Sequence, residues 1–276
     1  MKRILVIMVF PLIVLSMPLA SGATTMLNID RILYEADGGL ADPSALRGIA
    51  QATVTPAGGS YDFLLSIVLA NTTPFSAFSA DSSSVWLTGL GICLPDGFSV
   101  VGGQAWLTGA SGVYKGNTNV TGTVFTSSGE TQGNVSREWG YLNGTSGHFN
   151  DFSAFVDTNT QFSTMTADAG AQFAPGDLGG QKNGLNGPPW GLISQALVPY
   201  IPNSYMPGAY GIVNGITITA YLTGSGLDGA GLEAWIDQHD VVLTFGSPDA
   251  IPEPATLVLL GSGLVAVCIL ARRRLG

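Results

Sequence analysis

The sequence predicts an all-β protein, namely a single antiparallel β-sandwich of about ten strands with a jelly-roll-like plan. A signal helix is expected at its N-terminus and a transmembrane helix at its C-terminus. Three observations predict this fold. Short runs of β-branched, aromatic and apolar residues recur along the chain, and clusters of Gly, Pro, Asn and Asp separate them. Long apolar patterns with a helical period are absent from the middle of the chain.

The first 23 residues have the layout of a secretory signal peptide. Lys2 and Arg3 precede an apolar run from Ile4 to Leu19, and the small residues Ser21-Gly22-Ala23 follow. Two prolines interrupt the apolar run and disfavour a permanent membrane span. We expect signal peptidase to cleave after Ala23, which leaves residues 24–250 as the β-sandwich domain.

Ten segments of this body are predicted strands, because each is β-prone and ends at turn residues. They are Met26–Tyr34, Ile49–Thr55, Tyr61–Ala70, Val85–Leu94, Phe98–Thr108, Val120–Thr126, Phe152–Asp157, Gln161–Thr166, Ile216–Leu222 and Val241–Phe245. The Gly- and Pro-rich residues 170–190 predict a long irregular loop. Leu232–His239 is the one segment of the body expected to be helical.

The C-terminal segment, residues 251–276, consists of three parts. Pro252, Glu253 and Pro254 open it, an uncharged stretch of 17 residues at 255–271 follows, and Arg272, Arg273 and Arg274 close it. A stretch of this length is at the short end for a transmembrane helix. By the positive-inside rule the three arginines stay on the cytoplasmic side, which places the body outside the cytoplasm.

This order of parts resembles the PEP-CTERM sorting domain over about residues 251–274. In that family an exosortase, a membrane enzyme similar to transpeptidases, recognises the tail. The resemblance implies processing near Pro252-Glu253-Pro254 and transfer to the surface or matrix of a Gram-negative bacterium that makes exopolysaccharide. The same tail is also labelled an ice-binding protein C-terminal domain, a label that says nothing about binding ice. A plain single-pass anchor is the alternative.

The body is strongly acidic, with 18 acidic and 5 basic residues and a net charge of −13. This charge repels nucleic acid, because phosphate binding needs clustered Lys and Arg. It suits solubility outside the cell and weak attraction of cations. Cys93 is alone in the body and Cys268 lies in the C-terminal apolar stretch, so we expect no disulfide framework.

The body lacks recognisable catalytic motifs, and we expect it to have no catalytic residues, no metal site and no cofactor. It contains neither a Gly-x-Ser-x-Gly elbow nor a zinc-type His or Cys spacing. Glu233, Asp237 and His239 lie close together on a predicted helix and could form a metal cluster. The alternative interpretation is that they are a solvated polar face at the end of that helix. Calcium binding is a further metal-binding alternative, because the body has an excess of acidic residues and calcium binds to loop carboxylates. The acidic residues in or near predicted loops are Asp37, Asp42, Asp177, Asp228 and Asp240.

The aromatic residues indicate a binding alternative. Trp86 and Trp106 lie within predicted strands, and we expect them in the core. Trp139 and Trp190 flank Gly-rich segments, so these two and His148 are the candidate ligand-binding residues.

The leading functional prediction is a non-catalytic protein of the cell surface or extracellular matrix, associated with biofilm or exopolysaccharide. Before processing, one C-terminal helix anchors it in the membrane with the body outside the cytoplasm; after processing it is at the surface or extracellular. Signal peptidase and an exosortase are the expected partners. A carbohydrate- or ice-binding module is the first alternative, indicated by exposed aromatic residues and the Thr-rich strand Ile216–Leu222. An extracellular hydrolase is the second.

Overall fold

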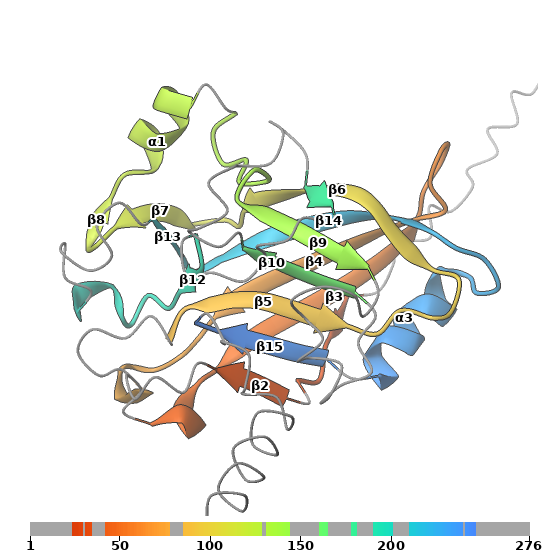
Figure 1. Ribbon diagram of the computed structural model, residues 1–276, viewed down its shortest axis with the longest axis horizontal. Coiled ribbons are helices and arrows are strands. Elements are labelled where there is room, and N and C mark those ends of the chain that lie inside the picture. Colours follow the sequence, from red (N-terminus) through yellow and green to blue (C-terminus); the bar gives the residue numbers. More distant parts are fainter. Residues whose placement is uncertain are drawn as a thin grey trace, which may run out of the picture.

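The computed structural model describes residues 24–29, 31–34, 42–77, 85–128, 131–143, 160–164, 178–180, 190–200, 210–239 and 241–246. These residues form fifteen strands, ten of them with four or more residues, and two α-helices. The strands make two sheets, which confirms the all-β prediction (Figure 1). Residues 1–23 and 251–276, where the signal and transmembrane helices are expected, lie outside the described residues.

The smaller sheet is antiparallel throughout and has the strand order β1-β3-β4-β14-β6. Its strands are β1 (Thr25–Met26), β3 (Gly48–Pro56), β4 (Phe63–Asn71), β14 (Gly215–Thr223) and β6 (Ser99–Leu107). Buried and half-buried residues alternate along β4 without interruption. Because side chains of a strand point to its two faces in turn, one face of this sheet enters the core and the other does not.

The larger sheet is built around β5 (Leu87–Ile92), which lies between β10 (Thr160–Thr164) and β15 (Val241–Phe245). The remaining strands are β2 (Arg31–Tyr34), β7 (Gly112–Lys115), β8 (Thr118–Asn119), β9 (Trp139–Asn143), β11 (Gly179–Gly180), β12 (Leu192–Ile193) and β13 (Gly211–Val213). Three pairs in this sheet, β11 with β9, β12 with β13 and β15 with β2, are parallel. The prediction of a purely antiparallel protein is therefore wrong for the larger sheet, while a jelly-roll-like connectivity stays a prediction.

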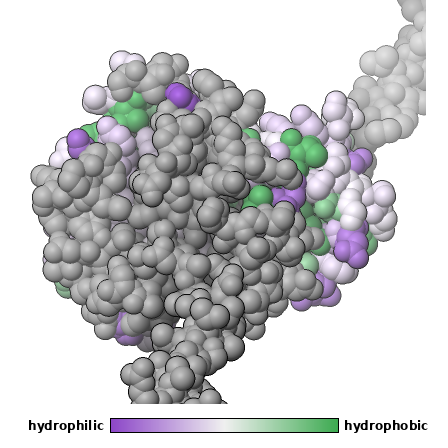
Figure 2. Space-filling view, in the orientation of Figure 1, coloured by the Kyte–Doolittle hydropathy of each residue, from purple (hydrophilic) through white to green (hydrophobic). Residues whose placement is uncertain are grey.

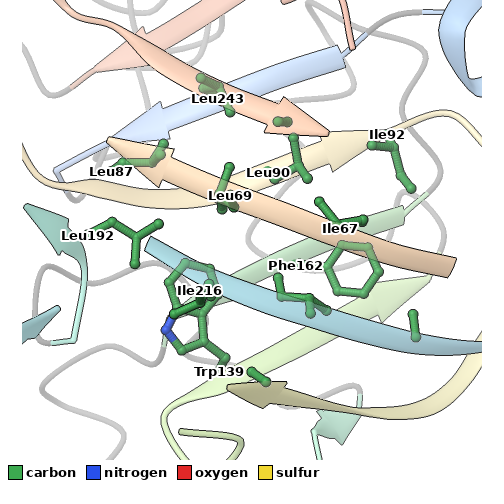
Figure 3. Packing of buried hydrophobic residues seen from close by; sticks show 14 of the residues in the cluster. Ile67, Leu69, Leu87, Leu90, Ile92, Trp139, Phe162, Leu192, Ile216 and Leu243 are labelled. Carbon is green, nitrogen blue, oxygen red and sulfur yellow. The ribbon is translucent and has the colours of Figure 1, made fainter. Parts of the chain in front are cut away.

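The core lies between the two sheets. Figure 3 shows side chains of the smaller sheet facing side chains of the larger one, among them Ile67, Leu69 and Ile216 opposite Leu90, Trp139 and Phe162. The sheets approach closely at Gly48, where an added Cβ would lie 3.3 Å from Cδ2 of Leu87 and would overlap Leu243. Asn214, with φ of 77°, is the single residue between β13 in one sheet and β14 in the other. A positive φ suits asparagine, and it turns the chain from one sheet into the next.

The helix α3 (Gly229–Gln238) forms where the sequence predicts a helix and lies at one end of the smaller sheet (Figure 1). Asp228 caps it by accepting a 2.8 Å hydrogen bond from the amide of Gly231. Leu232 and Ile236, four residues apart on one face, are buried. The helix contacts β3 and β1 and so closes this end of the space between the sheets.

The helix α1 (Thr121–Ser128) contradicts the strand predicted at Val120–Thr126. Its Thr and Val residues favour a strand by propensity, but local hydrogen bonds at its first residue stabilise a helix instead. The Oδ1 of Asn119 accepts from the amide of Thr121 at 3.0 Å, and the Thr121 hydroxyl accepts from the amide of Val113 at 2.8 Å. These bonds hold the start of the helix against β7.

One further prediction of a single element differs from the structure, and two others are not tested by it. The strand predicted at Met26–Tyr34 is two strands, β1 and β2, which belong to different sheets. Most of the loop predicted at 170–190 and the strand predicted at Phe152–Asp157 lie outside the described residues. Short 3₁₀ turns complete the described elements: η1 (Pro43–Ala45), η2 (Phe75–Ala77) and η5 (Val198–Tyr200).

Candidate functional site

The outward face of the smaller sheet is the candidate functional surface, and we call it the open face. Its residues share a half-buried state and alternate with core residues along four strands. They are Gln51, Thr53 and Thr55 of β3, Leu64, Ser66 and Val68 of β4, Thr217, Thr219 and Tyr221 of β14, and Gln104 and Trp106 of β6.

The strand register arranges these side chains in rows across the sheet. Thr219 of β14 lies opposite Ser66 on one side and Gln104 on the other, and Ser66 in turn lies opposite Thr53. The next row is Gln51, Val68, Thr217 and Trp106. The open face therefore presents ordered rows of hydroxyl and amide groups with aromatic rings beside them.

Two aromatic groups of the open face are held by specific contacts. The indole Nε1 of Trp106 donates a 3.2 Å hydrogen bond to Oε1 of Gln104. The rings of Tyr61 and Tyr221 stack with centroids 4.6 Å apart and planes 17° apart. Gly102 lies opposite Tyr221, and its lack of a side chain leaves room for that ring over β6.

A β-bulge in β6 lies next to these tyrosines. The register shifts after Tyr221, so that its partner is Gly102 while Leu222 pairs with Val100. Val101 is the extra residue and is 45% exposed. Bulges increase the local twist of a strand, which turns this corner of the open face.

The candidate ligand residues from the sequence are not gathered by the structure. Trp139 is fully buried in β9, so its ring has no surface for a ligand, and within the described residues its Nε1 has no hydrogen-bond partner. Trp190 is half-buried, with φ of 64°, and its ring lies 5.3 Å from that of Tyr210. β10 and β5 separate β9 from β12, the strand that follows Trp190. His148 lies outside the described residues.

Of the two tryptophans predicted to lie in the core, Trp86 and Trp106, the structure places one there. Trp86 is 3% exposed and belongs to the core, as predicted. Trp106 was expected there too, but it is half-buried on the open face. Its strand alternates, and its neighbour Ala105 takes the inward position. Strand membership alone therefore left open which of the two faces a tryptophan joins.

The carboxylates considered as metal ligands serve local structure where they are described. Asp42 accepts from the amide and hydroxyl of Ser44, and Asp228 caps α3. Glu233 accepts a 2.5 Å hydrogen bond from the hydroxyl of Thr25. Asp37, Asp177 and Asp240 lie outside the described residues.

His239, at the end of α3, likewise makes local structural contacts. Its Nδ1 lies 2.7 Å from the carbonyl oxygen of Trp235, and its ring stacks on that indole at 3.9 Å. Among the residues that the structure describes, no three His, Cys, Asp or Glu side chains are grouped to hold a metal ion.

Comparison with known proteins places a sorting signal at the C-terminus. Residues 250–274 match the family model of the PEP-CTERM protein-sorting motif, which contains Pro252, Glu253 and Pro254 as well as Arg272, Arg273 and Arg274. This motif indicates an exported protein targeted to an exosortase. No curated protein and no solved structure matches the chain. In the described part of the chain, no helix is long and apolar enough to cross a membrane.

The open face was only partly visible in the sequence. The alternation of Ile216–Leu222 marks one strand with Thr217 and Thr219 on the same side. Which strands lie beside it, and that Trp106 and Gln104 of β6 join the same face, depends on pairings between residues more than a hundred positions apart. A single sequence holds no local signal for such pairings.

Proposed function

We propose that the chain is an exported, non-catalytic protein of the cell surface or extracellular matrix, released from a single-pass membrane anchor by an exosortase. The observation that carries the proposal is the sorting motif at 250–274, which begins four residues after the last described residue, Gly246. The signal-peptide pattern of residues 1–23 supports the same route. Delivery through the membrane at one end and processing at the other leaves the β-rich body outside the cytoplasm.

The open face supports a binding or structural role for the body. Its eleven residues include no His, Cys or carboxylate, which are the groups that most often serve as acid, base or nucleophile. The described carboxylates Asp42, Asp228 and Glu233 stabilise a turn, a helix start and a strand–helix contact. An extracellular hydrolase stays a prediction that no described group of residues favours.

The sorting proposal is tested with two variants expressed in a Gram-negative host that carries an exosortase. One variant lacks residues 251–276, and the other replaces Pro252, Glu253 and Pro254 by alanine but keeps the apolar stretch and the arginines. We expect the deletion to release the body into the periplasm or medium. We expect the triple alanine variant to stay in the membrane at full length, because its span is intact and its processing site is not.

Cell fractionation and intact-mass measurement read out both variants, and the unaltered chain in a host without the exosortase is the control. The unaltered chain should then resemble the triple alanine variant. Unchanged fractionation after the deletion would reject the anchor. Normal processing of the triple alanine variant would reject Pro252-Glu253-Pro254 as the processing determinant, and an unaltered chain that stays at full length in the host with the exosortase would leave a plain anchor as the better account.

The second candidate is a carbohydrate- or ice-binding surface module, and the open face is the observation that favours it. Thr217 and Thr219 of β14 and Thr53 and Thr55 of β3 lie on this face, near the rings of Trp106 and Tyr221. Hydroxyl groups both donate and accept hydrogen bonds, so these threonines match the hydroxyls of a sugar or the oxygens of ordered water.

A further inference from the structure

The open face has no described structural element on its outer side. The described elements that pack most extensively against β3, β4, β14 and β6 from outside the smaller sheet are α3, β9, β11 and β12. The three strands belong to the larger sheet across the core. The helix α3 packs by Leu232 and Ile236, and Val54 on the core side of β3 lies 3.9 Å from the position of a Cβ on Gly229. The contacts of α3 therefore lie on the inward face of the sheet, whereas Leu178 and residues 133–136 form hydrogen bonds along the edge of β6.

Charge restricts what binds to this face. None of its eleven residues is charged, although the body as a whole has a net charge of −13. On the side of the molecule that Figure 2 shows, the coloured surface is a mixture of pale residues of intermediate hydropathy with purple and green ones. An anionic polymer would meet repulsion from the body and no cation on the open face to offset it. The matching partner is therefore an uncharged one.

The groups on the open face fit the two sides of a sugar ring. Trp106 and the stacked pair of Tyr61 and Tyr221 place aromatic rings on the open face, and such rings pack against the C–H face of a pyranose. Thr217, Thr219 and Gln104 supply donors and acceptors for its hydroxyl groups. Some of these groups are already oriented, since Oγ1 of Thr108 and Oγ1 of Thr217 are 3.0 Å apart and Trp106 is bonded to Gln104 at 3.2 Å. Oriented groups lose less conformational freedom on binding.

The spacing of the rings indicates a chain rather than a single sugar. Trp106 lies opposite Thr217, and Tyr221 is four residues further along β14. At about 3.3 Å per residue, the two rows are about 13 Å apart, which is more than one pyranose ring spans. A polymer lying along β14 reaches both rows and the Thr219 row between them.

We propose that the open face binds an uncharged polysaccharide along β14, stacked on Trp106, packed against the Tyr61–Tyr221 pair and hydrogen-bonded by the Thr219 row. This assignment rests on the proposed function, because it requires the body to be outside the cytoplasm, where such polymers occur. It adds the class of ligand and the residues that bind it.

The test is affinity electrophoresis of the full chain in a detergent without a sugar headgroup. The gels contain hydroxyethyl cellulose, soluble xylan or dextran as uncharged probes, and alginate as the anionic probe. Trp106→Ala removes a stacking surface and Thr219→Val removes a hydroxyl while keeping the shape and the strand propensity. Phe75→Ala is the matched control, since Phe75 is a 46% exposed aromatic residue in η2, outside the smaller sheet.

We expect retardation by at least one uncharged polymer and none by alginate. Trp106→Ala should weaken the retardation about tenfold or more, Thr219→Val about threefold, and Phe75→Ala not at all. Thermal melts of the variants establish that each is folded. Because Thr219→Val changes a single half-exposed hydroxyl, it keeps the test valid if Trp106→Ala fails to fold.

Four results would overturn the assignment. They are no retardation by any uncharged polymer, equal retardation by alginate, an equal loss with Phe75→Ala, and ice-growth inhibition in the absence of glycan binding. Self-association that Trp106→Ala abolishes, without glycan binding, would identify the open face as an interface between copies. Failure of glycan binding leaves the fractionation results of the sorting variants unchanged, so the two proposals fail separately.

Discussion

The Asn71 side chain connects three segments of the fold, and its removal gives a sharp prediction. Asn71 ends β4 and is 3% exposed. Its Nδ2 donates hydrogen bonds of 2.7 Å to the carbonyl oxygens of Val85 and Leu192, while its Oδ1 accepts from the amide of Thr73 at 2.9 Å. One amide group thus joins the smaller sheet to the chain entering β5 and to β12 of the larger sheet.

Asn71→Ala leaves two buried carbonyls and one amide without these partners. At about 1 kcal/mol for each lost hydrogen bond, the free energy of unfolding should fall by about 3 kcal/mol. For a domain of this size that loss lowers Tm by roughly 6–12 °C. Urea unfolding followed by tryptophan fluorescence, with a thermal melt beside it, measures both quantities.

Two further substitutions separate hydrogen bonding from the mere loss of atoms. Asn71→Asp keeps the shape but turns an ionised oxygen toward two carbonyl oxygens, so it should destabilise the fold more than alanine does. Asn119→Ala, at an exposed residue of β8, removes only the bonds to Thr121 and should cost about 1 kcal/mol. A loss below about 1 kcal/mol for Asn71→Ala, or a stable Asn71→Asp, would refute the reasoning.

Three other predictions concern the fold that supports the open face. Gly103→Ala places a Cβ against the carbonyl oxygen of Thr219 in the paired strand. We therefore expect a denaturation experiment to show a free energy of unfolding lower by several kcal/mol, or no folded protein. A wild-type Tm would contradict this. Asp228→Ala removes the cap of α3 and should cost about 1 kcal/mol in urea unfolding, with Asp228→Asn recovering most of it. Burial raises the pKa of the Tyr141 phenol, so the stability from the neutral phenol is present below the unfolded value of about 10 and is lost as pH rises through the folded pKa. Tyr141→Phe should therefore flatten the fall in Tm as pH rises above the unfolded value of about 10, and an unchanged slope would argue against this role.

The sequence predicts those elements whose signals are local. Strands β3, β4, β6, β14 and β15 lie within a residue or two of the predicted ranges because their alternation and their turns are encoded in consecutive residues. The helix α3 is also predicted, at Leu232–His239, and its observed range is Gly229–Gln238. Where propensity and local hydrogen bonds disagree, as at Asn119 and Thr121, the pattern gives a strand and the capped helix forms instead.

The candidate site could not be predicted from local sequence signals. Trp106 lies within a predicted strand and Trp139 flanks a Gly-rich segment, yet Trp139 is the one that is fully buried and Trp106 the one on the open face. The difference comes from the pairing of β9 with β10 and of β6 with β14, which sets the face that each residue joins. A pairing over such separations is a property of the whole fold, so the surface that carries the glycan proposal emerged only from the structure.

The last described strand determines how the sorting segment has to be tested. β15 lies between β5 and β2, and all five of its residues are buried. The amide of Gly246 then donates a 2.9 Å hydrogen bond to the carbonyl oxygen of Trp86, and the sorting motif begins at residue 250. Only residues 247–249 therefore separate an interior strand of the larger sheet from the sorting signal. A truncation before Val241 removes a central strand together with the tail, and its absence from the surface would report failed folding. A truncation at 250 keeps β15 and the Gly246 bond, so a change in its location reports sorting alone.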